Sequence, residues 1–166
     1  MKKIVLCCFA VLLPLFASCG EKTVPVYADV EDFAASLYAR AGIEKSGIYR
    51  EELEESSAFA FGLSRDEFDE YVDHAVCYRQ LVDNKGQTLY LFETEAAGDS
   101  LSLAQKIYAK YEFPPCDAAE KMTVACSGRY VMLFKSTASE VDAAAEGFRT
   151  LSGGALRFRK DKNNGG

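Results

Sequence analysis

The feature that most constrains the fold is a pattern that occurs twice, in which two short period-two apolar runs surround a tight turn. Residues 72–82 and 87–93 flank the turn sequence Asp83-Asn84-Lys85-Gly86, and residues 122–126 and 129–135 flank Ser127-Gly128. Period-two alternation around a glycine-containing turn is typical of a β-hairpin. The sequence therefore predicts two hairpins and four strands.

An amphipathic helix pattern follows each predicted hairpin. The first helix is expected to begin at Asp99 and to end before Pro114, and the second begins with a possible capping box, Thr137 and Glu140. The two units can be laid over each other, with residues 89–92 matching residues 131–134. We therefore predict an α+β fold with an antiparallel sheet of about four strands, built from two ββα units whose helices share one face.

Other segments extend this fold. Asp29 and Gly42 frame an additional N-terminal amphipathic helix over residues 30–41. Residues 49–71 are harder to interpret, although Ser64 and Glu67 predict a capping box and a short helix. Residues 59–61 remain unassigned, and residues 153–166 are expected to form a flexible basic tail.

The hairpin turns sort the strand residues onto two faces. They place Arg79 opposite Tyr90 and Val124 opposite Val131. One face forms the core under the two ββα helices, and the other is aromatic. Either residues 30–41 and 49–71 cover this second face, giving three layers, or part of it is open, and covering is the commoner arrangement. The candidate binding face comprises Arg79, Tyr90, Phe92, Tyr130, Met132 and Phe134.

The N-terminus is typical of an export signal. Lys2 and Lys3 precede an uncharged run over residues 4–16, which is too short to span a bilayer. The sequence Ala17-Ser18-Cys19-Gly20 resembles the lipobox of bacterial lipoproteins, although Phe16 stands where leucine is usual. The resemblance implies cleavage before Cys19 and lipidation of that cysteine. Conventional cleavage with release of a secreted protein is the alternative.

The predicted organisation is a signal peptide over residues 1–18, a lipidated tether over residues 19–28, a single domain over residues 29–152, and the tail. The formal net charge of the whole chain is −6, and loss of Lys2 and Lys3 makes it more negative. An acidic domain without a clustered basic surface argues against a nucleic-acid partner. The expected partners are the membrane, through lipid on Cys19, and an envelope protein or small ligand.

Three cysteines remain in the predicted domain: Cys77, Cys116 and Cys126. Their spacing matches no zinc motif, and the alternatives are buried thiols, one disulfide or a reactive cysteine. The predicted faces separate Cys77 from Cys126, which disfavours a disulfide between them.

No catalytic or cofactor-binding motif is present, and no cofactor is expected. His74 is the single histidine of the chain, and neighbouring Asp73 would point to the opposite side of a strand. The acidic stretches at residues 51–55 and 66–70 lack the pattern of a calcium loop, and we interpret them as solvated helix faces.

Taken together, the lipobox, the amphipathic helix, the two hairpin–helix units and the sequence Gly128-Arg129-Tyr130-Val131 resemble a bacterial lipoprotein family with a domain of unknown function. The resemblance covers residues 30–151 and implies a location on the extracytoplasmic side of the cell membrane, without catalytic residues. The leading hypothesis is a membrane-anchored binding or accessory module of the envelope. A small hydrolase or thiol-dependent enzyme using His74 or a cysteine, and a structural spacer, are the alternatives.

Overall fold

A computed structural model of the chain describes residues 27, 29–45, 47–81 and 85–165. Its centre is a six-stranded antiparallel sheet with the strand order β1-β2-β3-β5-β4-β6. The strands are β1 (Ile48–Glu52), β2 (His74–Gln80), β3 (Thr88–Glu93), β4 (Lys121–Ser127), β5 (Tyr130–Ser136) and β6 (Phe158–Asn163). The helices are α1 (Val30–Ala41), the 3₁₀ helix η1 (Glu55–Phe61), α2 (Arg65–Tyr71), α3 (Ala97–Lys110) and α4 (Ala138–Leu151).

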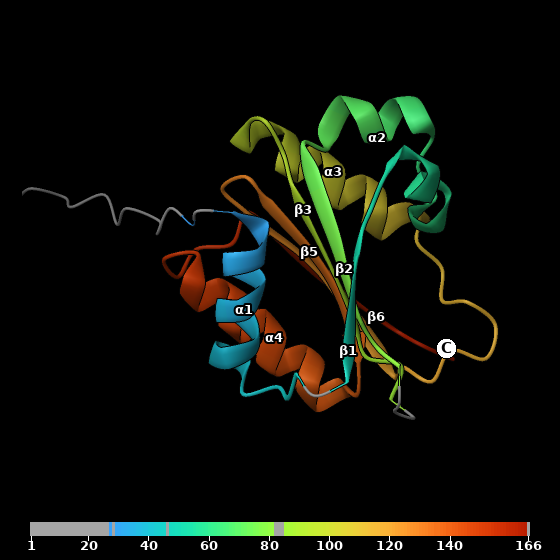
Figure 1. Ribbon diagram of the computed structural model, residues 1–166, viewed down its shortest axis with the longest axis vertical. Helices are drawn as coiled ribbons and strands as arrows, with labels where there is room; N and C mark the ends of the chain where they lie inside the picture. The colour runs from blue at the N-terminus through green and yellow to red at the C-terminus, as the bar shows by residue number, and fades with distance from the viewer. Residues whose placement is uncertain (1–26, 28, 46, 82–84, 166) are drawn as a thin grey trace, which may run out of the picture.

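Helices cover both faces of the sheet, so the domain has three layers (Figure 1). Helices α1 and α4 pack on one face, where Phe33 and Phe148 are buried against strand residues such as Met132. Helices η1, α2 and α3 pack on the other face, where Phe61 and Ile107 are buried. Three layers were expected, but the expectation that residues 30–41 and 49–71 cover one aromatic face together is wrong, because these two segments pack on opposite faces of the sheet.

The chain is an α+β protein, but the predicted four-stranded sheet built from two ββα units is wrong. Strands β2 to β5 occur where two hairpins were expected, and β1 and β6 extend the sheet at its two edges. The expected helix arrangement is also wrong, because α3 and α4 lie on opposite faces. The cause is the pairing of β3 with β5, which places Tyr90 beside Leu133 and Leu91 beside Met132. The side chains of the second hairpin that were predicted to share a face with Leu89 and Leu91 therefore lie on the opposite face of the sheet.

Within each hairpin, the predicted sorting of side chains holds although the register differs. Arg79 pairs with Thr88 rather than with Tyr90, and Val124 pairs with Leu133 rather than with Val131. Both differences are a shift of two residues. Because side chains alternate with a period of two, a shift of two leaves every side chain on its predicted face of the hairpin.

Several predicted helix ends are confirmed. The Asp29 side chain accepts a hydrogen bond from the Asp32 backbone N–H, and Gly42 ends α1 in the left-handed conformation. Ser64 and Glu67 form both bonds of the capping box that begins α2. Helix α3 begins earlier than expected, at Ala97, and ends before the prolines, at Lys110.

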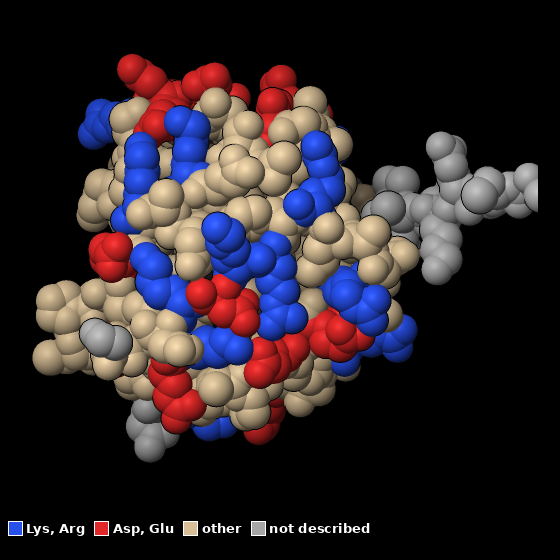
Figure 2. Space-filling model, turned by 180° about the vertical axis from the view of Figure 1, so that it is seen from behind, with Lys and Arg blue, Asp and Glu red and all other residues tan. Residues whose placement is uncertain are grey.

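The predicted flexible tail is wrong, because residues 158–163 form the edge strand β6 beside β4. Its Phe158 ring packs edge-on against Tyr108, with the ring centroids 6.1 Å apart. The basic side chains of this strand are compatible with an edge, where one row of backbone groups and most side chains face solvent. Seen from behind, the molecule shows basic and acidic side chains mixed on one face (Figure 2). Next to β6, Lys121 of β4 forms an ion pair with Asp142 at 2.8 Å.

The two ends of the central strands are used as landmarks below. His74, Glu93 and Tyr130 are aligned across β2, β3 and β5 at what we call the His74 end. Arg79, Thr88 and Lys135 are aligned at the opposite Arg79 end. Tyr27 packs against Phe33 and Tyr130, so the described chain begins at the His74 end.

No helix within the described residues is both long enough and apolar enough to cross a membrane. Residues 1–26, which hold the predicted signal peptide, Cys19 and most of the predicted tether, lie outside the described residues.

Candidate functional site

A cleft of about 410 Å³ opens at the Arg79 end of the sheet. One wall is made by β2, β3 and β5, and the other by the segment that joins α3 to β4. Strand residues at alternate or paired positions point to the same face, so Arg79, Tyr90 and Lys135 converge on this cleft. The complete lining is Arg79, Gln80, Gly86, Thr88, Tyr90, Pro114, Pro115, Cys116, Asp117 and Lys135.

Arg79 supplies a positive charge to the cleft. Its guanidinium interacts with the Cys77 thiol and the Tyr90 hydroxyl, which lie on the same face of the sheet. Burial raises the pKa of the Cys77 thiol to about 11 and that of Tyr90 to about 12, so both partners are neutral at pH 7. Among the described residues, no carboxylate forms an ion pair with Arg79. Its charge is therefore not compensated by those residues.

Lys135 carries the second positive charge, and Asp117 neutralises it. The two side chains form an ion pair in the cleft wall, with exposed fractions of only 9% and 4%. Asp117 also accepts a hydrogen bond from the Ala119 backbone N–H through its Oδ1 atom. Among the three charged residues that line the cleft, Arg79 is thus the one that forms no ion pair with another lining residue.

The segment between α3 and β4 is held firmly against the sheet. Asn164 donates hydrogen bonds to the carbonyl oxygens of Asp117 and Ala119, at 3.0 and 2.8 Å. Lys162 donates to the carbonyl of Tyr111 at 2.7 Å. Strand β6 and the residue after it therefore help to build the wall of the cleft.

Two backbone features mark this wall. Gly86 has a φ of +64°, and a Cβ atom there would lie 2.6 Å from the Ala119 nitrogen and 2.7 Å from the Asp117 Oδ1 atom. Cys116, with a φ of 63°, is the one non-glycine residue with positive φ in the part of the chain that is described. A left-handed conformation costs an L-residue roughly 1–2 kcal/mol, so the surrounding contacts must hold it in place.

The predicted candidate binding face is not a single surface. Arg79, Tyr90 and Phe92 lie on the α3 side of the sheet, whereas Tyr130, Met132 and Phe134 lie on the α1 and α4 side. Four of the six, the side chains of Tyr90, Phe92, Met132 and Phe134, are buried. The β3–β5 register separates the two groups. Arg79 and Tyr90 alone meet at the cleft, and Tyr130 stacks on Phe33 with ring centroids 4.5 Å apart.

Cys77, Cys116 and Cys126 are all free thiols. Cys77 and Cys126 are buried, and Cys116 is exposed at the cleft. The predicted location of Cys77 and Cys126 on opposite faces of the sheet is wrong, because both side chains lie in the core on the α3 side. Cys77 and Cys126 are kept apart because Cys77 lies in β2 and Cys126 in β4, and β3 and β5 lie between these strands in the sheet.

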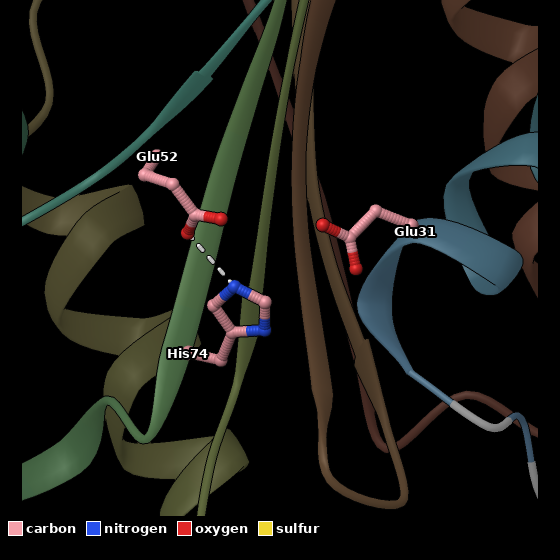
Figure 3. A group of neighbouring side chains, drawn as sticks. All are labelled: Glu31, Glu52 and His74. Atoms are coloured by element: carbon pink, nitrogen blue, oxygen red, sulfur yellow. Dashed lines mark hydrogen bonds and ion pairs between the residues drawn. The ribbon is translucent and has the colours of Figure 1, made fainter.

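A second polar cluster lies at the His74 end and joins α1 to the edge of the sheet. One ligating atom from each of Glu31, Glu52 and His74 lies within 4.8 Å of the others. His74 Nε2 is 2.8 Å from the Glu52 Oε2 atom, and Glu31 faces them from the first turn of α1 (Figure 3). Arg50 donates to Glu31 and, at 2.6 Å, to Glu52. These hydrogen bonds, first that from Arg50 and then that from His74, lower the pKa of Glu52.

His74, Arg79 and a cysteine are not gathered in one pocket. Arg79 and Cys116 line the cleft, whereas His74 lies at the opposite end of β2. The interpretation of residues 51–55 as a solvated helix face is wrong in part, because Glu51 and Glu52 belong to strand β1. Sequence reasoning also missed Gly86, Asp117 and Lys135, because their proximity arises only when distant segments pack together.

Comparison with known proteins supplies no relative for this chain. No family model, no curated protein and no solved structure matches it.

Proposed function

We propose that the protein is a lipid-anchored module on the extracytoplasmic side of the cell membrane, and that it binds a small organic anion in the Arg79 cleft. The anchor is inferred from the lipobox-like sequence around Cys19. The binding function is proposed because the cleft of about 410 Å³ contains the guanidinium of Arg79, which forms no ion pair with a described carboxylate. Clefts of about 300–1,000 Å³ are the usual size for small-molecule sites.

The lining favours one anionic group on a ligand with an apolar part. A guanidinium presents parallel N–H donors that match the two oxygens of a carboxylate or phosphate group. The Tyr90 hydroxyl is a further hydrogen-bonding group beside Arg79. Pro114 and Pro115 form an apolar part of the opposite wall. A small organic acid or phosphate ester satisfies both parts of this lining.

The test is a thermal-shift screen of the protein lacking residues 1–19 against small carboxylates and phosphate esters. We expect a subset to raise the midpoint of unfolding, because a ligand that binds only the folded state stabilises it. Arg79→Gln removes the charge and should abolish the shift. Arg65→Gln, at an exposed position in α2, is the matched control and should retain it.

Two results would contradict the binding proposal. One is the absence of a shift with any compound in the screen. The other is an equal shift for the wild-type protein and Arg79→Gln, since this would place binding elsewhere on the molecule.

A further inference from the structure

We infer that Glu31, Glu52 and His74 form a binding site for a divalent transition-metal ion, with Zn²⁺ as the best match, for which the Arg50 guanidinium is an internal competitor. The three candidate ligands come from α1, β1 and β2, and their ligating atoms already lie within 4.8 Å of one another (Figure 3). This site lies at the opposite end of β2 from the Arg79 cleft, so it is independent of the proposed anion binding.

The fold directs these side chains to one place. Arg50 and Glu52 are alternate residues of β1 and point to the same face of the sheet. The β1–β2 register pairs Glu52 with Val76, which places His74 on that face as well. Helix α1 covers this face, and Glu31 lies in its first turn. The cluster is therefore produced by tertiary packing rather than by a local motif.

The ligand chemistry favours a transition metal over a hard cation. Zn²⁺ binds imidazole nitrogen and carboxylate oxygen at about 2.0–2.2 Å. Mg²⁺ and Ca²⁺ prefer oxygen ligands alone. Three protein ligands would leave one tetrahedral position for water. The side chains of Glu31, Glu52 and His74 are 37%, 52% and 34% exposed, so small rotations can close the ligand atoms around an ion.

The charges identify the position as one that attracts cations. Two carboxylates face one guanidinium, so the cluster keeps one negative charge when His74 is neutral. Arg50 contacts both carboxylates, and its side chain is 38% exposed, which allows it to move into solvent. A metal ion and the guanidinium cannot share the same carboxylate oxygens. Removal of Arg50 should therefore strengthen metal binding.

Metal binding at this position also requires a proton to move. His74 Nε2 faces the Glu52 Oε2 atom at 2.8 Å, a contact in which the nitrogen donates. To ligate a metal, Nε2 must present its lone pair instead, with the proton moved to Nδ1 or released to solvent. Metal binding would therefore replace the hydrogen bond between His74 and Glu52 and make both atoms available as ligands.

The experiment is a calorimetric titration of the protein lacking residues 1–19 with Zn²⁺, in a Cys116→Ser background that removes the exposed thiol. We expect one ion per molecule and a higher unfolding midpoint in its presence. His74→Ala and Glu52→Gln should each weaken binding by at least about tenfold, because even the loss of a ligand's supporting partner costs that much. Mg²⁺ should give no comparable binding.

Arg50→Met separates the proposal from a purely structural ion-pair cluster. We expect this variant to bind Zn²⁺ about tenfold more tightly, because a nearby like charge has been removed. Glu51→Gln, whose side chain points to the other face of β1, should leave the affinity unchanged. Circular dichroism melts identify any variant that has unfolded. The proposal is overturned if folded Arg50→Met does not bind Zn²⁺, or if folded His74→Ala binds it as the parent does.

Discussion

Gly86 and Gly42 have almost the same backbone conformation but different surroundings. Their φ angles are +64° and +65°, and both lie in the left-handed region that favours glycine. A Cβ atom at Gly42 would meet nothing within 4 Å, whereas one at Gly86 would collide with the segment that forms the cleft wall. Substitution at Gly42 therefore tests the free-energy cost of backbone strain alone, whereas substitution at Gly86 adds the cost of a steric clash.

We expect Gly42→Ala to lower the free energy of unfolding by about 1 kcal/mol, which is the cost of the left-handed conformation alone. Gly86→Ala should lower it by about 3 kcal/mol, because displacement of the Asp117 wall is added to the same strain. Urea denaturation followed by far-UV circular dichroism measures both. Equal losses for the two variants would show that the wall yields freely.

At this scale the sequence is most informative where the interaction is local. The Asp29 cap and the Ser64–Glu67 capping box are predictable because the interacting groups lie three residues apart. The box expected at Thr137 and Glu140 forms only in part. The Glu140 backbone N–H donates to Thr137, but the Glu140 carboxylate accepts from Lys85 and Ser136. Lys85 lies 55 residues from Glu140, so the sequence around Glu140 does not predict that its carboxylate binds Lys85 instead of completing the capping box.

Among the elements, those with a clear hydrophobic pattern could be predicted and those without one could not. Strands β2 to β5 and the long helices each bury a regular set of side chains. Strand β1 buries none of its residues completely, and β6 is similarly open. An edge strand with charged side chains has no periodic apolar signal, so both edges of the sheet were missed.

Strand β6 should be essential to the domain rather than a removable tail. We expect a variant that ends at Leu156 to lose about 3 kcal/mol of stability or more, because several β4–β6 backbone hydrogen bonds are lost at about 0.5–1.5 kcal/mol each. It should also self-associate, since the edge of β4 becomes exposed.

A variant that ends at Asn164 is the control, because it keeps β6 and the Asn164 contacts with the cleft wall. Denaturation and sedimentation velocity distinguish the two truncations. If both behave as the full domain does, β6 contributes nothing to its stability.

For the whole molecule, the relation between the two hairpins was the decisive unknown. It is set by one pairing, between β3 and β5, whose residues are about 40 positions apart in the chain. A change of one residue in that register moves every side chain of one hairpin to the other face. Tyr90 and Met132 were therefore assigned to one surface although they lie on opposite sides of the sheet.

The proposed lipid anchor at Cys19 leads to a prediction for the protein that keeps residues 1–28. We expect the wild-type protein to fractionate with membranes and Cys19→Ser to be released, because two or more acyl chains give stable anchoring and the variant has none. Cys8→Ser, in the segment expected to be removed, is the matched control and should remain with the membrane. Retention of Cys19→Ser in the membrane fraction would exclude this anchor.

The described chain begins at the His74 end, and the cleft opens at the Arg79 end. These ends are separated by about 17 Å along β2, at about 3.3 Å per residue. This separation is about twice the roughly 8 Å over which a surface charge acts at physiological ionic strength. When either end of the sheet approaches a charged surface, the Arg79 cleft and the Glu31, Glu52 and His74 cluster are therefore exposed to different electrostatic potentials.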